Sequence, residues 1–316
     1  MHTFTRLALL TATVSCGVGA TAVLGAGCAE TSSEAVLEDD SGSPASVGRD
    51  ADARVKDTGT TEIVPPAEDG GSWPSCDTKP TALTPRPIVD LWNANPENPT
   101  DVWLSGVVVT AVSGSVCRAN SACQIFLQDD ETYSSLSAGS LHAIKLFISA
   151  ATAERFTGVS VGDRLDVRAW AWRYTLSGQN EMMVQINSQL HGCTKKVGTA
   201  TPEPTPAALS ALSLDAYENT VGPLLIRVSN VSGKPGTPTQ TFGLYTTGSP
   251  PSDAGTKQVV SASPYFIKGG AFDGLSQGAT TNFASISGIF GLFVPSAGTT
   301  KYLEIYTRSM NDVVTK

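Results

Sequence analysis

The chain has 316 residues, a formal net charge of −8 and an apolar fraction of 41%. The acidity lies in one segment: residues 29–75 contain 11 acidic and 3 basic residues, whereas residues 76–316 contain 18 and 17. A nucleic-acid binder that works through bulk basic charge is therefore excluded, because it needs clustered Lys and Arg. Disorder throughout the chain is also excluded, because 10 Phe and only 16% charged residues can build a core.

The first 28 residues have the pattern of an export signal. Arg6 is their only charged residue, residues 7–24 are apolar or small, and residues 25–28 read Gly-Ala-Gly-Cys. A basic start, an apolar run and small residues before a cleavage point are typical of a secretory signal. An apolar run of this length also leaves a retained membrane helix as an alternative.

The Gly-Ala-Gly-Cys sequence resembles the lipobox of bacterial lipoproteins, although Leu24 stands one position further from the cysteine than is usual. The resemblance implies that the thiol of Cys28 is diacylated, and that Ala29 after it directs the protein to the outer membrane. The expected partner of this end is thus a membrane, reached through a lipid anchor. Cys16 is an alternative lipid site, and a plain secreted protein without lipid is the other alternative.

Residues 29–75 are rich in Ser, Gly, Ala and Asp and show neither a helical nor a strand period. Such a composition cannot bury enough apolar area to offset the entropy lost on ordering, and its carboxylates repel one another. We expect a disordered acidic linker that holds a folded part away from a lipid surface. A calcium site is disfavoured, because the Asp-x-Asp-x-Asp-Gly loop pattern is absent from the sequence.

Four further cysteines follow, and an even number in an exported chain indicates disulfides. Cys117 and Cys123 flank a polar loop between two strand-like runs, so we expect a bridge across that loop. Cys76 and Cys193 would then join the start and the end of the first folded unit, although four cysteines allow three pairings. Zinc is disfavoured, because the sequence has no Cys-x-x-Cys pair.

Residues 76–195 have the pattern of a small all-β domain. Its strands are expected over 102–112, 124–129, 141–148, 163–172 and 181–189, with a helix over 150–156 and a helical turn over 88–93. Gly106 predicts a bend or bulge in the long first strand. The stretch 163–172 alternates polar and apolar residues and is the clearest strand signal in the chain.

A Pro-rich linker over 196–213 separates this domain from a second one, residues 214–316. The second domain repeats the pattern of the first, without a clear helix after its third strand. Its strands are expected over 224–231, 241–247, 258–265, 284–293 and 301–306. The shared element order indicates a diverged tandem repeat of one fold.

The order β-β-β-α-β-β, with a long bent first strand, is that of the OB-fold, a five-stranded Greek-key barrel. We therefore expect an all-β protein with minor helix, made of two OB-fold-like barrels in tandem after the tether. The chain also resembles exported OB-fold modules that are appended to secreted nucleases and occur in surface lipoproteins. That resemblance is carried by residues 104–108, 125–129, 161–167 and 307–312; the last resembles a Pro-Arg-Ser-x-x-Asp ending, with Thr307 in place of Pro.

Catalytic patterns are absent from the folded region of the sequence. Its two histidines, His142 and His191, do not lie near a nucleophile motif, and there is no phosphate loop, dinucleotide glycine pattern or HExxH. The run Asp129-Asp130-Glu131 is its densest carboxylate cluster, and it predicts either a solvated loop or, as the alternative, a metal site. We expect no enzyme, no cofactor and no metal.

One strand carries a candidate binding face, because residues two apart point to the same side of a strand. This face consists of Arg168, Trp170, Trp172 and Tyr174. Its large side chains could form a stacking platform for a base or a sugar. Alternatively, the tryptophans pack under the linker, the N-terminal helix or the second barrel.

Together these features predict a non-catalytic cell-envelope lipoprotein that acts as a binding or scaffold module for an envelope protein or a glycan. The alternatives are single-stranded nucleic-acid or oligosaccharide binding through the OB barrels, and an accessory chain of an exported nuclease. Nucleic acid is not the expected partner, because the nearly neutral folded region lacks the positive groove that tracks a phosphate backbone. The fold by itself does not decide among these.

Overall fold

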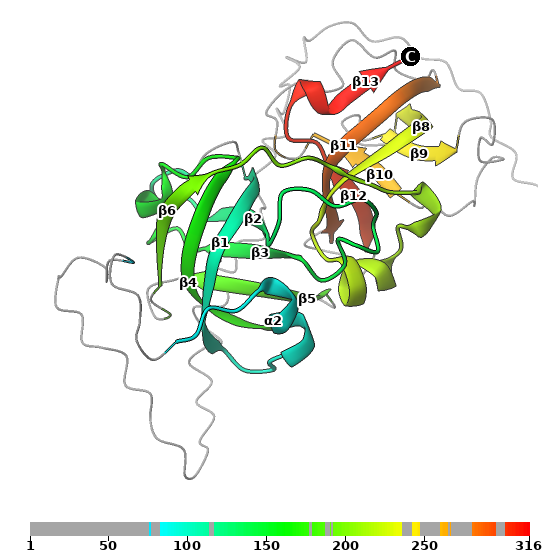
Figure 1. Cartoon of the computed structure of the whole chain (residues 1–316). Coiled ribbons are helices and arrows are strands. Elements are labelled where there is room, and N and C mark those ends of the chain that lie inside the picture. The colour runs from blue at the N-terminus through cyan, green and yellow to red at the C-terminus, as the bar shows by residue number, and fades with distance from the viewer. Residues whose placement is uncertain are drawn as a thin grey trace, which may run out of the picture. The chain divides into compact units, whose positions relative to one another are not determined.

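The computed structural model describes Cys76 and residues 83–113, 117–176, 179–186, 190, 192–235, 242–246, 260–264, 266, 280–294 and 301–316. The expected signal segment 1–28, with Cys16 and Cys28, lies outside these residues, and so do the acidic segment 29–75 and His191. The described residues are mostly strand, which confirms the expected all-β class, and they form two successive five-stranded rings (Figure 1).

The first barrel closes because its first and fourth strands pair. Its strands lie in the order β1-β2-β3-β5-β4, the pairing of β4 with β1 completes the ring, and β6 adds to the other side of β4. The strands are β1 (Thr100–Val112), β2 (Cys123–Gln128), β3 (Ala143–Ile148), β4 (Asp163–Leu176), β5 (Gln179–Ile186) and β6 (Cys193–Thr199). β3 and β5 run parallel, whereas the other neighbours are antiparallel. This is the expected five-stranded Greek-key barrel.

The bend expected at Gly106 allows β1 to pair with both β4 and β2. The pairing of β1 with β4 shifts register between Leu104 and Val107, and Gly106 has a φ of 69°, which glycine adopts at low cost. The Oδ1 atom of Asp166 accepts hydrogen bonds from the N–H of Gly106 at 2.9 Å and from the hydroxyl of Ser105 at 2.8 Å. Beyond this bulge, β1 continues into its pairing with β2.

The second sheet repeats the order of the first. It runs β8-β9-β10-β12-β11, and β11 pairs with β8 to make a ring. Within this ring β10 and β12 are the parallel pair, and outside it β7 runs parallel to β8. β7 and β13 add to its two ends. The strands are β7 (Thr205–Pro206), β8 (Leu225–Pro235), β9 (Phe242–Thr246), β10 (Val260–Ser263), β11 (Thr281–Phe293), β12 (Tyr302–Tyr306) and β13 (Val313–Thr315). The order of pairing therefore supports a repeat of one fold.

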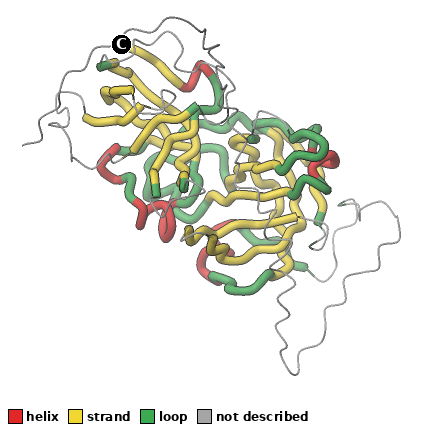
Figure 2. The backbone as a smooth tube through the Cα atoms, turned by 180° about the vertical axis from the view of Figure 1, so that it is seen from behind, coloured by secondary structure: helices red, strands yellow, loops and turns green. Residues whose placement is uncertain are grey.

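The helices that the structure describes are short (Figure 2). They are α2 (Ile88–Ala94), η2 (Ala153–Phe156), η3 (Leu209–Ala211), η4 (Ala216–Val221) and η5 (Met310–Asp312). The helix expected over 150–156 is only the 3-10 turn η2. Thr152 donates both its backbone N–H, at 3.0 Å, and its hydroxyl, at 3.1 Å, to the carbonyl of Ser149, which closes a tight turn where the helix was expected to begin.

Each barrel has its own apolar core, and both barrels belong to the same compact unit of the chain. The strand that alternates most clearly, β4, turns Val167, Ala169 and Ala171 into the first core, all fully buried, as the alternation predicts. The expected linker over 196–213 contributes the end of β6 and the whole of β7. It therefore reaches the second barrel as a paired strand.

Candidate functional site

The four cysteines of the described region form two disulfides. Cys76 is bonded to Cys193 at the start of β6, and Cys117 is bonded to Cys123 at the start of β2. This is the pairing that the sequence favoured among the three that were open. Two such bonds are consistent with an exported, oxidising compartment.

The candidate binding face on β4 lies outside the first barrel, as the alternation predicts. Arg168, Trp170, Trp172 and Tyr174 are all half-buried, whereas the residues between Arg168 and Trp172 on the other face are fully buried. The structure thus places the four side chains on one face. It does not leave them free, because each has a neighbour or is partly covered.

Arg168 is committed to a carboxylate of the neighbouring strand. Its Nε atom lies 3.2 Å from both oxygens of Asp101, and its Nη2 atom lies 2.7 Å from Oδ2. This hydrogen bonding raises the pKa of the Arg168 guanidinium above its usual range, against the opposing effect of partial burial. The charge of Arg168 therefore serves the β1–β4 pairing.

The aromatic residues of this face do not form a flat platform. The rings of Trp172 and Tyr174 meet edge to face, with centroids 6.2 Å apart and planes at 73°. The hydroxyl of Tyr174 is buried and has no hydrogen-bond partner among the described residues, and burial followed by the nearby charge of Glu181 raises its pKa. A base or sugar would need one exposed ring face, so this packing favours the structural alternative for Trp172 and Tyr174.

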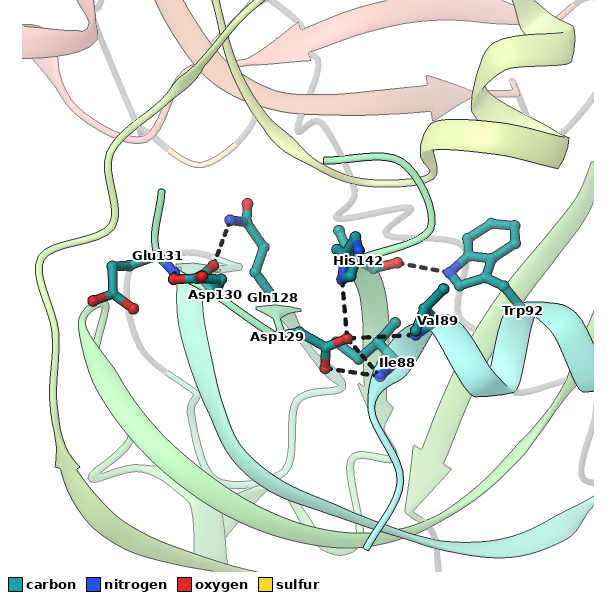
Figure 3. Close-up of polar contacts among 9 residues, drawn as sticks. Ile88, Val89, Trp92, Gln128, Asp129, Asp130, Glu131 and His142 are labelled. Atoms are coloured by element: carbon teal, nitrogen blue, oxygen red, sulfur yellow. Dashed lines mark hydrogen bonds and ion pairs between the residues drawn. The ribbon is translucent and has the colours of Figure 1, made fainter. Parts of the chain in front are cut away.

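Asp129, the first residue of the carboxylate cluster, binds the start of helix α2 (Figure 3). Both of its carboxylate oxygens accept the N–H of Ile88 at 2.7 Å, one accepts the N–H of Val89 at 3.4 Å, and His142 Nδ1 lies 3.3 Å away. Burial raises the pKa of Asp129, although these hydrogen bonds oppose the shift. Asp129 thus satisfies helix N–H groups that have no partner within the helix.

The rest of the cluster is dispersed into separate contacts. Asp130 accepts the backbone N–H of Glu131 at 2.7 Å, and Glu131 forms an ion pair with Arg164. Figure 3 shows the Glu131 side chain directed away from Asp129 and His142. Within the described residues, no group of three or more His, Cys, Asp or Glu side chains is placed to hold a metal ion. The prediction that this run is solvated is wrong for Asp129, whose side chain is only 15% exposed.

Part of the outer face of β2, at Phe126 and Gln128, is buried by the second barrel. Ile125 and Leu127 point into the first core, whereas Phe126 belongs to a separate cluster that contains residues of both barrels. Its members are Ala111, Phe126, Leu225, Phe266, Ile289 and Tyr306. The rings of Phe126 and Phe266 meet edge to face with centroids 5.3 Å apart. We call this apolar cluster the junction.

Buried polar contacts surround the junction. The side-chain oxygen of Gln128 accepts the N–H of Leu225 at 2.8 Å, and Nη1 of Arg308 donates to the carbonyl of Thr110 at 3.2 Å. Each of these bonds joins a strand of the first barrel to a residue of the second. Because a polar group buried without a partner is costly, such bonds fix the register of the two surfaces.

A buried ion pair lies at the same interface. On β5, Glu181 is 4% exposed; it accepts a hydrogen bond from Lys145 Nζ at 2.6 Å and another from the hydroxyl of Tyr217, which belongs to η4. Burial, followed by the charge of Glu181, raises the pKa of Tyr217 well above its usual range. Tyr217 therefore stays protonated, and its O–H donates a hydrogen bond to Glu181 that links the two barrels.

The junction has a direct consequence for ligand binding by the first barrel. OB-folds bind oligonucleotides and oligosaccharides mainly over strands 2 and 3. Here two outward side chains of β2, Phe126 and Gln128, are 2% and 0% exposed, and the second barrel covers them, whereas Gln124 on the same face is half-exposed. That part of the face is therefore closed to a ligand in this arrangement.

A polar groove of about 540 Å³ lies outside the second barrel. Its floor is formed by β8 and β11, and its walls by the linker and by the turn and strand at the end of the chain. Lining residues are Pro202, Glu203, Pro204, Arg227, Ser229, Ala284, Ser285, Ser287, Arg308, Asn311, Asp312 and Val314. Its volume falls within the range of small-molecule sites.

Sequence reasoning did not find this groove, because its residues come from four separate segments. The strand alternation was visible: Arg227 and Ser229 share one parity in β8, and Ser285 and Ser287 share one in β11. Pairing places Arg227 opposite Ser287 and Ser229 opposite Ser285. Only the closure of β11 onto β8 brings these two rows side by side.

No protein-family model matches this chain, and no curated protein is significantly similar to it. No helix among the described residues is long and apolar enough to cross a membrane. The site must therefore be interpreted from its own geometry.

Proposed function

We propose that this chain is a non-catalytic binding or scaffold module of the cell envelope, anchored by a lipid on Cys28 and held off the membrane by residues 29–75. One observation carries the proposal: the outer face of β2 packs against the second barrel, and hydrogen bonds fix the two surfaces together. Two barrels packed against one another on a long tether suit a protein that presents a fixed surface to an envelope protein or a glycan.

The placement of the charged side chains supports a non-catalytic role. Glu181 is paired with Lys145, Glu131 with Arg164, and Arg168 with Asp101. Each pair links neighbouring strands or loops. A general base or nucleophile needs an accessible group and a converging partner, which these structural pairs do not provide.

The junction weakens the alternative of nucleic-acid or oligosaccharide binding over the β2–β3 face of the first barrel, because Phe126 and Gln128 are covered there. An accessory role beside an exported nuclease rests on the sequence resemblance alone. Either alternative would have to use a different surface of the protein.

The anchor is tested by metabolic labelling of the full chain with an alkyne fatty acid in a bacterial host. We expect label on the wild type and on Cys16→Ser, the matched control, and both proteins in the membrane fraction. We expect Cys28→Ser to carry no label and to leave the membrane. Label retained on Cys28→Ser would refute Cys28 as the lipid site.

The binding class is tested with the full chain and a fluorescent oligo-dT of 12 nucleotides at low salt. We expect no change in anisotropy and no cleavage of the oligonucleotide with added Mg²⁺. Binding that weakens steeply as salt rises would favour the nucleic-acid alternative instead. Cleavage would overturn the non-catalytic proposal.

A further inference from the structure

We propose that the polar groove on the second barrel is a binding site for a sugar that carries a single carboxylate. This inference deepens the proposed function, on which it rests, because it names a ligand class and a site for the binding module. The site lies on the outside of β8 and β11, away from the junction residues of β2.

The groove is built from rigid parts. The N–H of Glu203 donates to the carbonyl of Glu131 in the first barrel at 2.9 Å, and Thr205 and Pro206 pair with β8. Pro202 and Pro204 flank Glu203 and fix their own backbone torsions. The wall formed by the linker is thus held at both ends before any ligand arrives.

The opposite wall is held by a closed turn. Arg308 donates to both carboxylate oxygens of Asp312, from Nε at 3.2 Å and from Nη2 at 3.0 Å, and Ser309 and Asp312 form a reciprocal cap. Since Arg308 also donates to Thr110, its guanidinium is largely committed to the protein, and its side chain is only 17% exposed. Arg308 therefore shapes the groove and does not supply its free charge.

Arg227 is the cation available to a ligand. Its Nε donates to the hydroxyl of Ser287 at 3.2 Å, which fixes the guanidinium on the floor of the groove. Its ion pair with Glu203 is loose at 3.9 Å, and the two side chains are 44% and 56% exposed. An exposed ion pair of this kind contributes little to the stability of the fold, so a ligand carboxylate can take the place of Glu203 beside Arg227. A planar guanidinium binds a carboxylate through two parallel hydrogen bonds.

The other lining groups suit a polyol. Ser229 and Ser285 present hydroxyls from the floor, and Asn311 adds an amide from the wall. Ser287, at 4% exposure, holds Arg227 through its hydroxyl. Among the described residues that line the groove, none is aromatic, so a nucleobase would find no stacking partner. Glu203 and Asp312 also border the groove and disfavour a ligand with several negative charges. A single carboxylate with several hydroxyls satisfies these conditions together.

The test is an ¹⁵N NMR titration of the full chain with glucuronate, with glucose as the neutral match and acetate as the carboxylate without hydroxyls. We expect saturable shifts at the backbone amides of Ser229, Ser285 and Ser287 with glucuronate, and at least tenfold weaker binding of glucose and acetate. Arg227→Gln should lower the affinity for glucuronate roughly ten- to a hundredfold. Arg118→Gln, which removes an exposed arginine outside the groove lining, should leave it unchanged.

A second variant distinguishes loss of binding from misfolding. Ser285→Phe fills the groove from a half-buried position and should abolish the shifts while the remaining spectrum is retained. Absence of saturable shifts, equal affinity for glucose and glucuronate, or insensitivity to both groove variants would overturn the inference. Glucuronate shifts confined to β4 would also overturn it, while leaving the proposed binding module intact. Membrane release by Cys28→Ser tests the tether independently of either result.

Discussion

The side-chain oxygen of Gln128 accepts the backbone N–H of Leu225, 97 residues further along the chain, at 2.8 Å. Both residues are fully buried. Gln128 also donates through Nε2 to the carbonyl of Asp130 at 3.0 Å (Figure 3). The Gln128 amide thus orders the end of β2 and accepts the backbone N–H of the first residue of β8. This one side chain therefore links the two barrels.

Replacing Gln128 with leucine is expected to destabilise the protein. The change keeps the size of the side chain but leaves the N–H of Leu225 buried without an acceptor, which costs about 1–3 kcal/mol. Urea denaturation measures the loss. Gln124→Leu is the matched control, because Gln124 is on the same face of β2 but half-exposed, and it should cost less than about 0.5 kcal/mol. Equal costs for the two variants would contradict the role of Gln128.

Removing one partner of the buried pair Lys145–Glu181 is expected to cost more than removing both. Glu181→Leu leaves the Lys145 ammonium uncompensated at 16% exposure and the Tyr217 hydroxyl without its acceptor, a loss of about 3–5 kcal/mol. The double variant Glu181→Leu/Lys145→Met should recover part of that loss. A double-mutant cycle by urea denaturation measures the coupling. Additive effects would show that the two side chains do not stabilise one another.

The barrels could be predicted from the sequence, because their strands alternate. In β4, Val167 and Ala169 face the core and Arg168 faces outward, and that period of two fixed both the strand and its faces. The junction could not be predicted. Ile125, Phe126 and Leu127 form a continuous apolar run, which indicates burial on both faces but does not say what covers the outer one.

The candidate site was harder to predict than the fold, for a physical reason. The alternation of β4 predicts that Arg168 faces outward, which the structure confirms, but its partner Asp101 is 67 residues away and only the pairing of β1 with β4 reveals it. The sequence predicts a solvated side chain for Asp129, because its partners are backbone N–H groups of α2, which carry no sequence signal. A side chain whose partners are backbone groups, or a site assembled from distant segments, can be predicted only when the fold is known.

The stability of the protein is expected to depend on pH through Glu304. Burial raises its pKa to about 7 from an ordinary value of 4.5, although a hydrogen bond with Ser263 opposes the shift. The folded state therefore holds this proton more tightly than the unfolded chain does. The stabilising contribution is fully present below pH 4.5 and is lost as the pH rises through 7.

Glu304→Gln is expected to remove this dependence, because glutamine carries no charge at any pH. The variant should match the wild type near pH 4 and exceed it by about 3 kcal/mol at pH 8. Urea denaturation across that range measures the difference, and Glu203→Gln, at 56% exposure, is the control, which should keep the pH dependence of the wild type. A difference between Glu304→Gln and wild type that is constant with pH would show that Glu304 titrates normally.

The most direct test of the central claim, that the two barrels form one body through the junction, is a set of residual dipolar couplings from the backbone amides of both barrels. The claim predicts that one alignment tensor fits the couplings of β1–β5 and of β8–β12 together, with the barrels oriented as the contact of Phe126 with Phe266 requires. Two tensors that differ in magnitude or orientation would mean that the barrels move independently, and would contradict it.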